Sequence, residues 1–76
     1  MSNPNTQIEP RLYYKYAEID VDTGECLGVR TQTYAVNNPA LIPIPVEDYD
    51  YIGKYYINGN WYEDPEGTIP WTSSLL

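Results

Sequence analysis

The chain has 76 residues, so it forms one domain at most, and a chain this short buries only about 60% of the surface that its unfolded form exposes. Its single cysteine excludes an internal disulfide, and the absence of histidine excludes a structural zinc site with the usual four Cys and His ligands. The net charge of −7 argues against direct binding to nucleic acid or to an anionic membrane surface. The remaining route to extra stability is association, so we expect other protein chains as partners, either different subunits or further copies.

The sequence also indicates where the protein is made. Its apolar stretches are too short to span a bilayer, and the N-terminal MSNPNTQIEPR has no basic region followed by an apolar segment, so we expect neither a membrane span nor a signal peptide. The lone Cys26 fits a reducing compartment. We therefore expect synthesis in a cytoplasm.

The first part of the chain predicts an arm followed by a strand. Residues 1–10 contain two prolines and several small polar residues, with Ile8 as the only apolar residue after the initiator. We therefore expect an extended arm that is poorly ordered unless it lies on another surface. The run LYYKYAEI, residues 12–19, is rich in tyrosine and predicts a strand with aromatic surface on both faces.

A hairpin is predicted next. Residues 20–25, DVDTGE, read as its loop, with Gly24 at a positive φ, and residues 25–36 read as its second strand. Folding at this loop is expected to bring Leu27 and Val29 next to Ala17 and Ile19, which would form a small apolar patch.

Residues 37–53 are rich in proline. Pro39, Pro43 and Pro45 remove backbone donors, while the apolar residues between them require burial, so we expect a packed crossing segment with an edge strand in it. The stretch EDYDYIG predicts one helical turn or a bend that ends at Gly53.

A second hairpin follows. Asn58-Gly59 is the strongest short-range signal for a two-residue type I′ turn, because both positions need φ > 0. We expect strands near 54–57 and 60–63, with Tyr56 or Ile57 opposite Trp61. No helical periodicity extends over ten residues, so the fold class is all-β or nearly so: a small domain over 11–64, two hairpins joined by the proline-rich segment, and an extended tail over 65–76.

No pattern for catalysis or metal binding is present. An EF-hand loop beginning at Asp20 would need Gly at its sixth position and Glu at its twelfth, where the chain has Glu25 and Thr31. The acidic clusters 47–50 and 63–66 fall in predicted exposed turns, where carboxylates are usually only solvated, and Cys26 has no histidine partner. We expect no enzyme activity, no cofactor and no metal.

Three segments resemble small modules of tail and baseplate proteins of tailed bacteriophages. These are an Ile-Asp hairpin with two glycines, an acidic D-Y-I-G-K segment and a closing Y-x-N-G-x-W hairpin. The resemblance covers roughly residues 14–64, implies a virion component or tail-assembly factor, and carries over no active-site residues. The matching residues are Ile19, Asp20, Gly24, Gly28, Val29, Asp50, Tyr51, Ile52, Gly53, Lys54, Tyr56, Asn58, Gly59 and Trp61.

The function expected from the sequence is therefore a non-enzymatic structural or assembly protein of a phage tail or baseplate, located in the virion. The alternative is an acidic phage-encoded inhibitor that imitates the charge of nucleic acid and binds a host defence or regulatory protein. Trp71 is the expected anchor on another chain; otherwise it folds back beside Trp61. The expected partner-binding residues are Ile8, Tyr14, Tyr16, Trp61, Ile69, Trp71, Leu75 and Leu76.

Overall fold

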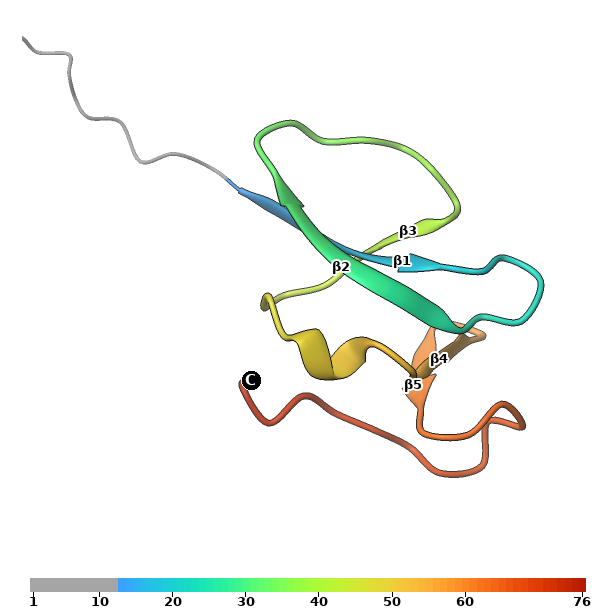
Figure 1. Ribbon diagram of the computed structural model, residues 1–76. Coiled ribbons are helices and arrows are strands. Elements are labelled where there is room, and N and C mark those ends of the chain that lie inside the picture. The colour runs from blue at the N-terminus through green and yellow to red at the C-terminus, as the bar shows by residue number, and fades with distance from the viewer. Residues whose placement is uncertain (1–12) are drawn as a thin grey trace, which may run out of the picture.

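The computed structural model describes residues 13–76, which form two small antiparallel sheets and one short 3-10 helix (Figure 1). The first sheet has the strand order β2-β1-β3, and the second is the hairpin β4-β5. The predicted all-β class is confirmed. In chain order the elements are β1 (Tyr14–Ile19), β2 (Cys26–Gln32), β3 (Leu41–Pro43), η2 (Tyr49–Tyr51), β4 (Tyr55–Ile57) and β5 (Asn60–Tyr62).

The proline-rich segment supplies the edge strand that its sequence predicts. β3 pairs antiparallel with β1, and Tyr16 lies opposite Pro43, the last residue of the strand. Proline has no backbone donor, so it is tolerated at an edge and not in the middle of a sheet. The pairing continues past β3, since the Ile44 N–H donates to the Lys15 carbonyl at 3.0 Å.

The first hairpin differs from the prediction at one residue. Ala17 lies opposite Val29 as expected, but Ile19 lies opposite Cys26, and the register shifts between Glu18 and Ile19. Leu27 is the extra residue of this β-bulge and is 57% exposed, whereas Cys26 is 1% exposed. The expectation that Leu27 packs beside Ala17 and Ile19 was wrong, because a bulge reverses which side chains face the core.

The second strand is also shorter than predicted and ends at Gln32 instead of residue 36. Gln32 pairs with Tyr14, the first residue of β1, so the ladder ends where its partner strand begins. Beyond it, the Val36 N–H donates to the Tyr16 hydroxyl at 3.1 Å, which fixes the loop without further strand pairing.

The second hairpin matches the prediction. Asn58 and Gly59 have φ values of 51° and 86°, as a two-residue turn with both φ angles positive requires. Tyr56 lies opposite Trp61, and their ring centroids are 5.1 Å apart. Cross-strand aromatic pairs of this kind stabilise a thin sheet.

Replacing Gly59 by valine should lower the free energy of unfolding by at least about 1 kcal/mol, because a β-branched residue is strained at φ 86°. Urea unfolding followed by tryptophan fluorescence measures this loss. Gly28→Val is the matched control: Gly28 lies in β2 without a positive φ, and a Cβ there meets nothing within 4 Å. Equal stability of the two variants would contradict the turn geometry.

The two sheets are joined by backbone contacts at the first hairpin loop. The Tyr56 N–H donates to the Gly24 carbonyl at 2.9 Å, and the Cys26 N–H donates to the Lys54 carbonyl at 2.8 Å. The Gly53 N–H in turn donates to the Cys26 carbonyl at 3.0 Å. The first hairpin, residues 53–54 and β4 therefore meet at one junction.

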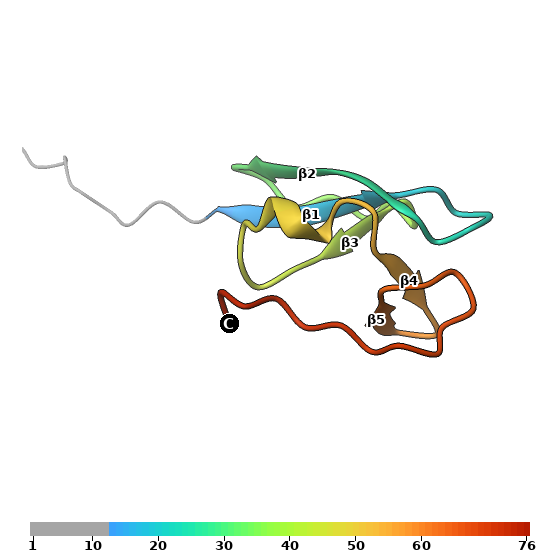
Figure 2. The ribbon, with the colours of Figure 1, turned by 60° about the horizontal axis from the view of Figure 1, so that its bottom comes forward.

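The layers are clearest when the molecule is turned: the β2-β1-β3 sheet lies on one side, and β4, β5 and the C-terminal segment lie on the other (Figure 2). A small core fills the space between them. Its buried members are Ala17, Ile19, Cys26, Ile44 and Tyr51, with Val29, Ile42, Tyr56, Trp61 and Trp71 packed against them.

Candidate functional site

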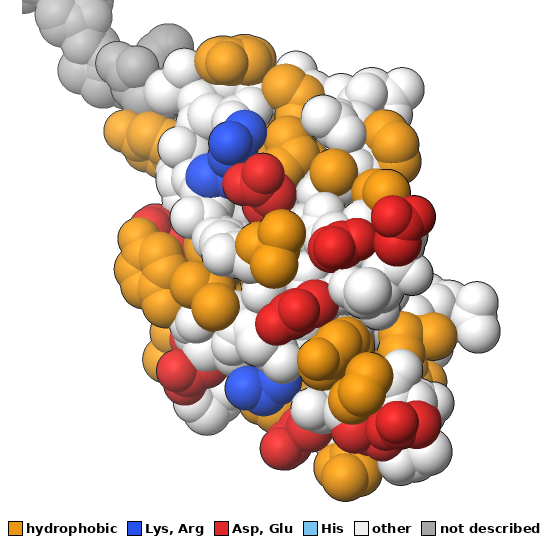
Figure 3. Space-filling model, turned by 45° about the vertical axis from the view of Figure 1, so that its right-hand side comes forward, with side chains coloured by type: hydrophobic (Ala, Val, Ile, Leu, Met, Phe, Trp, Pro, Cys, Tyr) orange, Lys and Arg blue, Asp and Glu red, His pale blue; other side chains and the backbone are white. Residues whose placement is uncertain are grey.

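Two of the surface carboxylates form turns. Asp20 accepts from the Asp22 N–H at 2.8 Å within the first hairpin loop, and Asp64 accepts from the backbone N–H groups of Thr68 and Ile69. On the face in Figure 3, acidic side chains are scattered among apolar ones. Within residues 13–76, no group of three or more Cys, Asp or Glu side chains is arranged to hold a metal ion.

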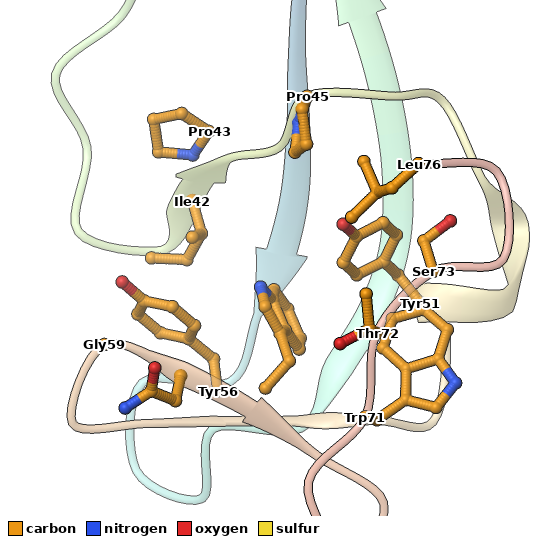
Figure 4. Close-up of a pocket in the computed structure, with 12 residues that line it drawn as sticks. Ile42, Pro43, Pro45, Tyr51, Tyr56, Gly59, Trp71, Thr72, Ser73 and Leu76 are labelled. Carbon is orange, nitrogen blue, oxygen red and sulfur yellow. The ribbon is translucent and has the colours of Figure 1, made fainter.

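The most distinct surface feature is a groove of about 430 Å³ between the two sheets and the C-terminal segment (Figure 4). None of its lining side chains is charged, although the chain has a net charge of −7. β3 and the residues after it form one wall, the second hairpin forms another, and the C-terminal segment forms the third. The lining residues are Ile42, Pro43, Pro45, Tyr51, Tyr56, Gly59, Asn60, Trp61, Trp71, Thr72, Ser73 and Leu76.

Tyr51 holds the aromatic residues of the groove together. η2 places it in the core, 3% exposed, and its ring meets Trp61 and Trp71 edge to face at centroid distances of 5.0 and 4.8 Å. Edge-to-face pairs contribute stability beyond the area that they bury. Burial, together with the charge of Asp48, raises the pKa of the Tyr51 hydroxyl, so this residue is neutral at physiological pH.

The C-terminal segment is part of the folded unit. The Glu63 N–H donates to the Ile69 carbonyl at 2.8 Å, and the Trp71 N–H donates to the Trp61 carbonyl at 3.0 Å. The segment thus lies along the free edge of β5. The sequence predicts that residues 65–76 extend toward another chain, with Trp71 as the anchor. In the structure Trp71 folds back beside Trp61, which is the alternative given above.

The end of the segment is held by a buried polar pair. Asp48 is 6% exposed and Ser73 4%, and the Ser73 hydroxyl donates to the Asp48 carboxylate. Asp48 also caps η2 by accepting from the Asp50 N–H at 2.9 Å. The Ser73 hydroxyl, and then the Asp50 N–H, lower the pKa of Asp48 below its ordinary value of 3.8, because both hydrogen bonds favour the ionised form.

This pair predicts a loss of stability in acid. A carboxyl group whose pKa is lowered on folding stabilises the protein above its unfolded pKa, and this contribution is lost as the pH falls through the folded value. The melting temperature should therefore decrease as the pH is lowered below about 4. The fall should be smaller in Asp48→Asn than in the wild-type protein, because the amide does not titrate.

The control for that measurement is Asp22→Asn, at an exposed position in the first hairpin loop. It should retain the wild-type dependence on pH, since Asp48 remains in it, as does Asp64, whose pKa the Thr68 hydroxyl also lowers. Identical pH profiles for Asp48→Asn and the wild-type protein would show that the pair contributes no pH dependence.

Lys54 lies beside the groove. Its Nζ is 4.8 Å from the centre of the Trp71 ring and donates to the Asp50 carbonyl at 3.0 Å. A cation over an indole ring is held by the ring quadrupole, so Lys54 fixes the outer side of Trp71. The contact orients the ring and leaves the groove itself uncharged.

The structure places the expected partner-binding residues in different surroundings. Trp61, Trp71 and Leu76 line the groove. Tyr16 is 5% exposed, so most of its ring is buried in the chain's own fold. Ile8 lies outside the described residues. The others are half-buried or exposed away from the groove: Tyr14, Ile69 and Leu75.

Sequence reasoning missed several groove residues. From the sequence, Ile42, Pro43 and Pro45 are predicted only as part of a crossing segment, Tyr51 only as part of a helical turn or bend, and Tyr56 only as a strand residue. The density of proline beside tyrosine and tryptophan was the available signal, but nothing in the sequence placed residues 42–45 opposite residues 71–76.

Cys26 is buried and has no catalytic surroundings. Its Sγ donates to the Gly28 carbonyl at 3.3 Å, and burial raises the pKa of its thiol, which keeps it protonated.

Within the described part of the chain, no helix is long and apolar enough to cross a membrane. Comparisons with protein-family models, with curated proteins and with solved structures gave no match.

Proposed function

We propose that the chain is a non-enzymatic structural or assembly protein of a bacteriophage tail or baseplate, and that it docks on other protein chains through the groove. The observation that carries the docking role is the uncharged lining of this groove in an otherwise acidic protein. Cores of protein interfaces are depleted in charge and enriched in Tyr and Trp, which is the composition found here.

The aromatic residues of the groove are suited to this work. Trp61 and Trp71 are half-buried, and the ring of Tyr51 holds both of them. Rings fixed before binding lose little conformational entropy when a partner arrives, and Trp and Tyr are enriched among residues that dominate binding energy. The groove is therefore prepared for an apolar partner segment.

The virion assignment is supported by the resemblance of residues 14–64 to phage tail and baseplate modules. Mass spectrometry of particles purified from the encoding phage tests it. The chain should be present at a fixed ratio to the tail proteins and should stay with the tail fraction when tails and capsids are separated.

The alternative function gives the opposite result. An acidic inhibitor of a host protein, which the net charge of −7 favours, should be made early in infection and be absent from purified particles. Absence from particles that contain all other tail proteins would overturn the virion proposal and favour the inhibitor.

A further inference from the structure

A second, smaller hollow continues from the groove toward the beginning of the described chain. It has a volume of about 190 Å³, and Pro43 lines both hollows. A track of mixed aromatic, apolar and polar surface thus leads from the start of β1 to the aromatic groove. The residues that line the second hollow are Tyr13, Tyr14, Lys15, Tyr16, Pro43 and Ile44.

The chain contains a segment with the properties that this track requires. Residues 1–12 precede Tyr13 and can span about 40 Å when extended. They include Pro4, Ile8 and Pro10, which are apolar groups of the kind that the groove accommodates. Proline-containing segments bind aromatic-lined grooves at a low entropic cost, because their backbone is already extended.

Charge also favours this segment as the occupant. Residues 1–12 contain one acid, Glu9, and one base, Arg11, so their formal charges cancel. Residues 13–76 hold 10 of the 11 acidic and 3 of the 4 basic residues, and therefore the whole net charge of −7. The segment is neutral, so the acidic remainder of the chain does not repel it, whereas two folded bodies without it repel each other.

We propose that the groove receives residues 1–12 of a second copy of the chain, in a reciprocal exchange of arms. β1 begins at Tyr14 beside the Pro43–Pro45 end of the groove, and the axis of this strand, followed backward from Ile19 to Tyr14, points out of the molecule (Figures 1 and 2). A segment that continues this direction leaves its own groove behind, but reaches the groove of a neighbour without reversing. Two-fold symmetry then pairs each arm with the opposite groove.

The proposal rests on the docking role of the groove in the proposed function. Sedimentation velocity of the full chain over a concentration series tests it with three variants. Ile8→Glu changes the arm, Leu76→Glu changes the groove, and Leu75→Glu is the matched control, since Leu75 and Leu76 are both exposed but only Leu76 lines the groove. Circular dichroism shows whether each variant is folded. If Leu76→Glu does not fold, Thr72→Glu replaces it, because Thr72 is another exposed residue that lines the groove.

The wild-type protein and Leu75→Glu should form dimers with the same dissociation constant, and Ile8→Glu and Leu76→Glu should each raise that constant more than tenfold. An equimolar mixture of Ile8→Glu and Leu76→Glu should restore dimers, because one intact arm then meets one intact groove. A monomeric wild-type protein, equal effects of Leu75→Glu and Leu76→Glu, an unaffected Ile8→Glu dimer, or a mixture that stays monomeric would each overturn the proposal. The chain would still pass the particle test if it docks only on other subunits, so the two proposals can fail separately.

Discussion

Gly24→Ala should remove a large part of the protein's free energy of unfolding. A Cβ at Gly24 would lie 2.5 Å from the Tyr56 carbonyl oxygen, and the residue has a φ of 82°. Backbone strain costs about 1–2 kcal/mol and overpacking about 1–3 kcal/mol, which gives about 2–5 kcal/mol together. A domain of this length has about 4–11 kcal/mol in total. Urea unfolding followed by tryptophan fluorescence measures the loss.

Gly53→Ala is the matched control for this substitution. Its φ of 90° is just as unfavourable for alanine, but a Cβ there meets nothing within 4 Å. It should therefore lose only the strain, about 1–2 kcal/mol. If Gly24→Ala proved no more destabilising than Gly53→Ala, the close approach of the first hairpin loop to β4 would be contradicted.

Trp71→Ala should be the most damaging substitution in the C-terminal segment. Trp71 packs edge to face on Tyr51 at 4.8 Å and lies under the Lys54 ammonium group. Truncating a fully buried aromatic residue costs about 3–5 kcal/mol, and because Trp71 is half-buried we expect about 2–4 kcal/mol. Thermal and urea unfolding of the purified protein measure this loss without a partner present.

Leu75→Ala is the control for Trp71→Ala, because Leu75 belongs to the same segment and is 60% exposed. It should change stability by less than about 0.5 kcal/mol. A Trp71→Ala protein as stable as Leu75→Ala would show that Trp71 is not part of the chain's own core. That result would favour the role of Trp71 as an anchor on another chain.

Local signals in the sequence were sufficient for much of the fold. The turn at Asn58-Gly59 followed from two positions that need a positive φ, and the edge strand at residues 41–43 followed from prolines that cannot donate to a ladder. Each of these features depends on neighbours within a few residues, where sequence patterns are informative.

Features that depend on distant contacts could not be predicted in this way. The bulge at Leu27 reverses the inward-facing residues of β2, and nothing in the alternation of the strand indicates the extra residue. The groove forms because Ser73 reaches Asp48 and Trp71 reaches Tyr51, across 25 and 20 positions of the chain. The sequence predicted the pairing of Tyr56 or Ile57 with Trp61 across the hairpin, but it did not indicate that Tyr51 would meet Trp61 and Trp71.

The groove as a docking surface is the central claim, and it is tested most directly in the assembled particle. Under the proposed virion role, the encoding phage with the gene deleted is complemented with Leu76→Glu or with Leu75→Glu, and the copies of the chain in purified particles are counted by quantitative mass spectrometry. We expect Leu75→Glu at the wild-type copy number and Leu76→Glu at less than a tenth of it, because an unpaired carboxylate in an uncharged groove opposes docking. Equal copy numbers for the two variants would contradict the claim.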